Sequence, residues 1–82
     1  MNVYLVMAEH YRVPGIIMRV AATRELAVKE ALAAANIMLS DAGMATVADE
    51  ISMNAAIETL QDEHGAAHCY VDITTHDVIA ED

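Results

Sequence analysis

The chain has no Phe and no Trp, and three tyrosines are its only large aromatic side chains among 82 residues. Alanine supplies much of the 56% hydrophobic content, so the core must be built from Leu, Ile, Val and Met. A core of this kind is thin, and a chain this short buries only about 60% of its unfolded surface. We therefore expect a single domain over residues 1–82 with a stability of about 5 kcal/mol. Contact with a partner or a second copy would add buried surface.

Cysteine and long apolar runs are scarce as well. The single Cys69 excludes an intramolecular disulfide, so a reducing compartment is the default expectation. No apolar run approaches the roughly 20 residues of a membrane-spanning helix, and the first residues lack the features of a signal peptide. We therefore expect a cytoplasmic protein that makes no membrane contact.

Basic residues are missing from most of the chain. Arg12, Arg19, Arg24 and Lys29 all lie in the first 29 positions, where two acids leave a net charge of +2. Residues 30–82 contain eleven acids and no Lys or Arg, which brings the chain to −9. This charge argues against direct nucleic-acid binding, because Lys and Arg are needed to replace phosphate counterions. The acidic part favours either contact with a basic protein surface or simple solubility.

Residues 23–40 have the pattern of a helix around which the rest of the chain packs. Thr23 is suited to cap the start, and Gly43 follows the end in the position of a C-terminal cap. Polar residues occupy one narrow strip and apolar residues most of the circumference. We therefore expect a helix that is covered on more than one side, with alanines that allow a close neighbour.

Strand patterns precede this helix. Residues 2–8 and 16–22 predict two strands, joined by a loop that contains a Pro14-Gly15 turn. Alternation favours one set of apolar side chains on the face against the helix: Val3, Leu5, Met7, Ile16, Met18 and Val20.

A second helix and a third strand are predicted after it. A capping-box pattern at Thr46 begins the helix over residues 46–64, which Gly65 ends. Its apolar stripe is narrow and consists of Met53, Ile57 and Leu60. Strict alternation over residues 67–75 predicts the strand, whose inward side chains are Ala67, Cys69, Val71 and Ile73.

The element order β-β-α-α-β predicts an α+β, two-layer fold with a three-stranded, mostly antiparallel sheet packed on two antiparallel helices. The other face of the sheet is then open. The residues expected there for self-association are Tyr4, Val6, Ile17, Arg19 and Tyr70. So apolar a face indicates either an interface, such as that of a homodimer, or a face that a loop or the tail covers.

Patterns for catalysis are missing. There is no nucleophilic triad, P-loop or dinucleotide-binding motif, and the acids Glu58 and Asp62 lie on a solvated helix face without a cleft. We therefore expect no enzyme and no cofactor. The only metal-type cluster consists of His64, His68, Cys69 and His76. Gly65 breaks the helix between the first two histidines, so we expect no metal site, and a metal or pH sensor is the weaker alternative.

The opening of the chain, with NVYLVMAE, a Pro-Gly turn, IIMRVAA and TRELAVKEALAAA, is similar to the strand–strand–helix start of many short phage and mobile-element proteins. With its length and its charge of −9, the chain resembles the small acidic anti-CRISPR inhibitors. This resemblance implies a protein that binds a CRISPR effector complex and blocks DNA recognition, in several cases by acting as a DNA mimic.

Two functions are therefore expected. The first is a non-enzymatic inhibitor or modulator whose carboxylates bind a Lys/Arg-lined groove of a nucleic-acid-handling protein. The residues predicted to make this contact are Asp49, Glu50, Glu58, Asp62, Glu63, Asp72, Asp77, Glu81 and Asp82. The alternative is a small structural or assembly module that self-associates through the open sheet face.

Overall fold

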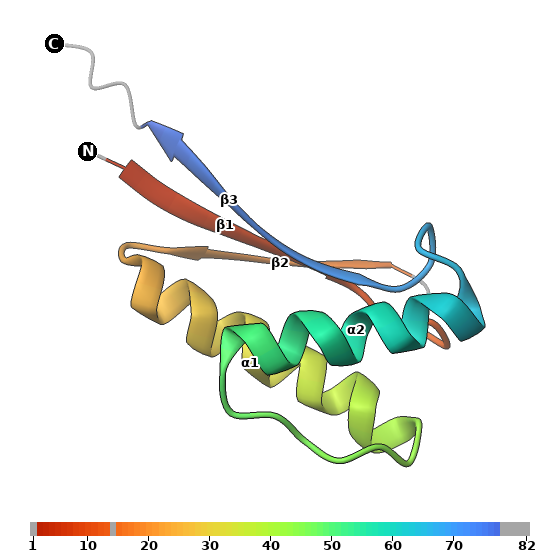
Figure 1. Ribbon diagram of the computed structural model, residues 1–82. Coiled ribbons are helices and arrows are strands. Elements are labelled where there is room, and N and C mark those ends of the chain that lie inside the picture. Colours follow the sequence, from red (N-terminus) through yellow and green to blue (C-terminus); the bar gives the residue numbers. More distant parts are fainter. Residues whose placement is uncertain (1, 14, 78–82) are drawn as a thin grey trace, which may run out of the picture.

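The computed structural model describes residues 2–13 and 15–77. The element order is β1 (Asn2–Glu9), β2 (Ile16–Ala21), α1 (Arg24–Asp41), α2 (Glu50–His64) and β3 (Tyr70–Asp77). The three strands form one antiparallel sheet in the order β2-β1-β3, and both helices lie on the same side of it (Figure 1). The predicted α+β fold with the order β-β-α-α-β is confirmed. Pro14 of the predicted turn lies outside the described residues.

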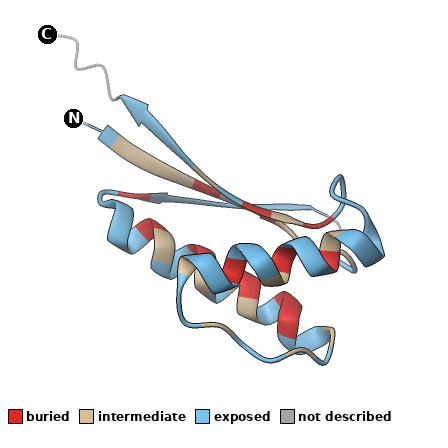
Figure 2. Ribbon diagram, in the orientation of Figure 1, coloured by how far each residue is buried: buried red, intermediate tan, exposed pale blue. Residues whose placement is uncertain are grey.

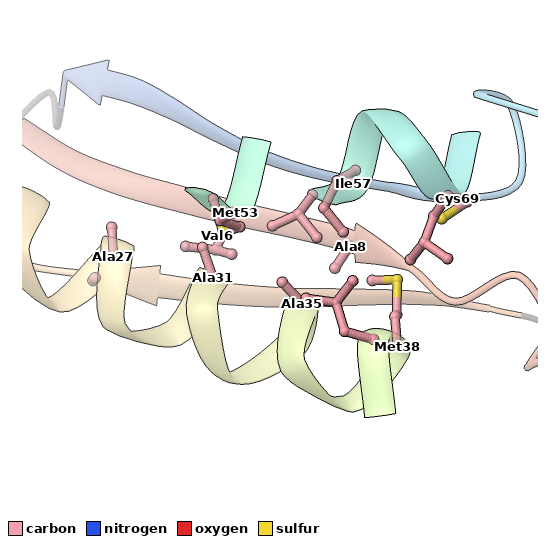
Figure 3. Close-up of a cluster of buried hydrophobic side chains, with 13 residues drawn as sticks. Val6, Ala8, Ala27, Ala31, Ala35, Met38, Met53, Ile57 and Cys69 are labelled. Atoms are coloured by element: carbon pink, nitrogen blue, oxygen red, sulfur yellow. The ribbon is translucent and has the colours of Figure 1, made fainter. Parts of the chain in front are cut away.

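α1 is the central element, because it contacts all three strands and α2. Its start is capped as predicted: the Thr23 hydroxyl accepts a hydrogen bond of 3.2 Å from the backbone N–H of Leu26. The side chains of Ala27, Ala31 and Ala35 are fully buried and lie along the seam with the sheet (Figure 3). Small side chains at this seam allow the helix axis to lie close to the strands.

α2 begins later than predicted and runs in a different direction. The Asp49 carboxylate, rather than Thr46, caps its start by accepting hydrogen bonds from the N–H and hydroxyl of Ser52, at 2.7 and 3.1 Å. The two helices run in the same general direction, and the connection over residues 42–49 returns along α1 (Figure 1). The prediction of antiparallel helices was therefore wrong.

The side chain of Asn36 anchors the connection that precedes α2. Its amide donates a hydrogen bond of 3.0 Å to the carbonyl oxygen of Val47 and accepts one of 2.8 Å from the N–H of Val47. This pair of bonds holds Val47 and the connection beside α1, and the helix begins only at Glu50. α2 then starts near the start of α1, where Glu50 meets Arg24.

In β1 and β2 the two faces are exchanged relative to the prediction: the side chains expected against the helices lie on the open face, and their neighbours in the sequence face the helices. Val6, Ala8 and Ala21 are buried against the helices, whereas Met18 and Val20 are 54% and 71% exposed on the opposite face. Both alternating sets in β1 are apolar, so the period alone did not orient the strand. The close approach of the alanine face of α1 favours the set that contains the smaller side chains.

For β3 the prediction of faces was mostly correct. Cys69 and Val71 are buried and Ile73 packs against the core, but Ala67 lies exposed before the strand begins. The core occupies the middle of the molecule, between the sheet and the two helices (Figure 2). The start of β1 and the end of β3 project beyond the helices (Figure 1). The buried core consists of Val6, Ala8, Ala21, Ala27, Ala31, Ala35, Met38, Leu39, Met53, Ile57, Leu60, Cys69 and Val71.

Candidate functional surfaces

The outward face of α2 carries two of the predicted partner-binding acids side by side. Glu58 and Asp62 lie one helical turn apart, on the side opposite the buried stripe of Met53, Ile57 and Leu60. Both residues are exposed. Glu63 is also exposed but lies on the flank, where its Oε2 is 3.7 Å from Nε2 of His64. We call Glu58, Asp62 and their neighbour Ile51 the outward face of α2.

Two other acids of this region already have intramolecular partners. The hydrogen bonds from Ser52 hold the pKa of the Asp49 carboxyl below its usual value. Both carboxylate oxygens of Glu50 accept hydrogen bonds from the Arg24 guanidinium, at 2.7 and 3.0 Å, and this contact raises the pKa of Arg24. Asp49 and Glu50 therefore hold α2 in place, and their carboxylates are less available to a partner than those of Glu58 and Asp62.

The remaining acids do not share this surface. Asp72 of β3 lies opposite Met7 of β1 in the sheet register and points to the open face, away from the helices. Asp77 ends β3. Glu81 and Asp82 lie outside the described residues.

The open face of the sheet is a second candidate surface, and it is mainly apolar. Cross-strand pairs on this face join Leu5 to Val20 and Met7 to Met18. Ile16, at the start of β2, is 53% exposed. Large apolar side chains therefore cover β1 and β2 on the side opposite α1 and α2.

Most of the residues predicted for self-association lie elsewhere. Val6 is 2% exposed, and Tyr4, Ile17 and Arg19 share its side of the sheet, which faces the helices. Only Tyr70, opposite Glu9 in the register, lies on the open face. The composition predicted for the open face was thus wrong in four of its five residues, as a result of the exchanged faces of β1 and β2. Self-association itself stays a prediction.

A buried histidine lies at the end of β1, where the sequence patterns indicated no site. His10 is 8% exposed, and its Nε2 lies 2.7 Å from the Oδ2 of Asp41. Its Nδ1 accepts a hydrogen bond of 3.0 Å from the backbone N–H of Arg12, so the proton of a neutral ring is carried by Nε2, which donates to Asp41. This pair joins the β1–β2 loop to the end of α1.

Aromatic rings stack beside this histidine. The ring of Tyr11 lies between those of His10 and His64, with centroid distances of 4.7 and 4.1 Å, and its hydroxyl is buried without a hydrogen-bond partner. His64 is thus part of a stack at the end of α2. Within residues 2–13 and 15–77, no three His, Cys, Asp or Glu side chains are grouped as metal ligands.

Cys69 is the only thiol, and it faces the core. Its side chain is fully buried, and this burial raises the pKa of the thiol. A thiol with a raised pKa is mostly protonated at neutral pH and is therefore a weak nucleophile. Its geometry fits a packing role between β3 and α2.

None of the protein families, curated proteins or solved structures compared with the chain matches it. Among the described residues, no helix is both long and apolar enough to cross a membrane.

Proposed function

We propose that this protein is a non-enzymatic modulator that uses the outward face of α2 to bind a basic surface of a nucleic-acid-handling protein. The observation that carries the proposal is the pair of exposed carboxylates of Glu58 and Asp62, one turn apart on a face without a cation. No Lys or Arg follows Lys29 in the sequence, so the second half of the chain contains none that could neutralise them. Carboxylates form strong charge-assisted hydrogen bonds with the Lys and Arg side chains that otherwise bind phosphates.

Ile51 adds an apolar contact to this charged face. Its side chain is 84% exposed, and it lies seven residues before Glu58, on the same side of α2. Burial of such a side chain in a partner gains free energy that it does not gain in the isolated protein. Charged groups mainly increase the association rate and set the orientation, whereas a buried apolar contact slows dissociation.

The partner that this chemistry fits is a protein complex with a Lys/Arg-lined groove for nucleic acid. A CRISPR effector complex is the first such partner to test, because of the resemblance in length, charge and opening pattern. In that case the bound protein would occupy the groove and block DNA recognition. No catalytic step is required for this effect.

Capture from a bacterial lysate tests the assigned surface. Immobilised wild-type protein should retain a Lys/Arg-rich nucleic-acid-binding protein at about 50 mM salt and release most of it at about 200 mM. The double variant Glu58→Lys/Asp62→Lys should capture none. The control Glu25→Lys/Glu30→Lys changes the net charge by the same amount at two exposed positions of α1 and should capture as the wild type does. Undiminished capture by the first variant, or an equal loss in both, would contradict the proposal.

A further inference from the structure

The two edges of the sheet differ in how they are protected. On the open face, the β3 edge presents the polar side chains of Asp72, Thr74 and His76. The β2 edge presents Ile16, Met18 and Val20, all more than half exposed. Edge strands carry unpaired backbone N–H and C=O groups, and monomeric proteins usually guard them with charges. β3 is guarded in this way, and the open face of β2 is not.

Apolar surface also continues around β2 to its other face. Ile17 of β2 is 39% exposed and Ile37 of α1 is 58% exposed. Together with Val13 they line a groove of about 350 Å³ beside the strand. Apart from Arg19, the edge is therefore apolar on both faces. Arg19 is the only charged residue of β2, and its neighbour across the adjoining pocket is Glu30 of α1.

The charge distribution favours the β2 edge for contact between two copies. Residues 16–41, which include β2 and α1, contain three bases and three acids, whereas residues 42–77 contain seven acids and no Lys or Arg. Two chains of charge −9 repel each other most where their acidic parts meet. Contact at β2 brings together the two segments 16–41, in which bases and acids are equal in number. It places the acids of α2 and β3 at the two outer ends of the dimer.

We propose that a second copy of this chain pairs with the β2 edge, antiparallel and about a two-fold axis, so that the two sheets become one six-stranded sheet. This contact is separate from the outward face of α2, so it stands or falls independently of the proposed partner binding. In such a pair, directly opposite residues have their side chains on the same face of the sheet. The two-fold axis must therefore lie between one residue and the same residue of the second copy, and we name the axis after that residue.

An axis through Met18 is the register that fits the side chains. It places Met18 opposite its own copy, and Ile16 opposite the Val20 of the second copy, so every pair on the open face is apolar. On the other face, Arg19 lies opposite the second copy's Ile17. An axis through Arg19 would set two like charges opposite each other, which is unfavourable. An axis through Ile17 would leave the end of β2 unpaired.

Sedimentation and cross-linking test this pairing. The wild type should sediment as a dimer at about 100 µM and dissociate on dilution. Met18→Lys should be monomeric, while Thr74→Lys, at an exposed position on the same face of the β3 edge, should remain dimeric. Circular dichroism confirms that both variants are folded. A wild type that is monomeric at about 100 µM, or a Met18→Lys variant that remains dimeric, would overturn the proposal.

Disulfide cross-linking tests the register of the two β2 strands. Opposite residues of an antiparallel pair have Cα atoms about 4.5–5.5 Å apart, which a disulfide can bridge. Oxidised Met18→Cys should therefore form a disulfide-linked dimer, and the wild-type thiol of Cys69 is buried and should not interfere. Val20→Cys, on the same face of the same strand, lies opposite Ile16 of the second copy and should remain unlinked. Equal cross-linking of the two variants would overturn the proposed pairing.

Discussion

Asn36 is the residue whose replacement most directly tests how the two helices are arranged. Asn36→Ala removes both hydrogen bonds to Val47, of 3.0 and 2.8 Å, and leaves the N–H and C=O of this half-buried residue without their partners. Each bond contributes about 1 kcal/mol, and the unpaired backbone groups add to the loss, so we expect a destabilisation of about 2–3 kcal/mol. That is about half of the stability of a small domain near 5 kcal/mol.

Urea denaturation followed by circular dichroism measures this loss. With a slope of about 1 kcal/mol per M, the midpoint of Asn36→Ala should lie about 2–3 M below that of the wild type, with the slope unchanged. The control is Asn54→Ala, at an exposed position of α2, which should stay within about 0.5 kcal/mol of the wild type. Equal midpoints for Asn36→Ala and the wild type would refute the role of this side chain in holding the connection.

Other changes have clear expected results. Leu60→Ala, at a fully buried site, should cost about 2–5 kcal/mol and leave much of the chain unfolded by circular dichroism, whereas Ile51→Ala should have little effect. Cys69 should react with a thiol reagent only in denaturant, because the native thiol is buried and its pKa is raised; rapid native labelling would contradict this. The pKa of Asp49 is lowered in the folded state, so its stabilisation is present above the unfolded value of about 3.9 and is lost as the pH falls through the lower folded value. The urea midpoints of the wild type and Asp49→Ala should therefore differ at neutral pH and converge in acid.

Local signals were sufficient for much of the fold. The capping position of Thr23 and the glycine at position 65 correctly set one end of each helix. The direction of α2 was not predictable in this way. The connection before α2 is bonded to Asn36, eleven residues earlier, and the sequence pattern placed Asn36 on a polar strip that was expected to face water.

The sequence correctly predicted which side chains are exposed only where the helical repeat within a single helix determines exposure. Glu58 and Asp62 lie on the outward face of α2 as their spacing indicated. The engagement of Glu50 depends on Arg24, 26 residues earlier, and the burial of His10 depends on Asp41, 31 residues later. Contacts between residues so far apart in the sequence produce no local sequence pattern from which they could be predicted. The open sheet face was misassigned because both alternating sets of β1 are apolar, and because the β2 set that contains Arg19 lies on the side of the helices although a charged residue was expected on the open face.

Competition with nucleic acid tests the central claim most directly. The captured partner is loaded with a fluorescent duplex, and the protein is added while the anisotropy of the duplex is followed. Wild-type protein should release the duplex, and Glu58→Lys/Asp62→Lys should not. A complex in which the partner holds the duplex and the wild-type protein together would contradict the account.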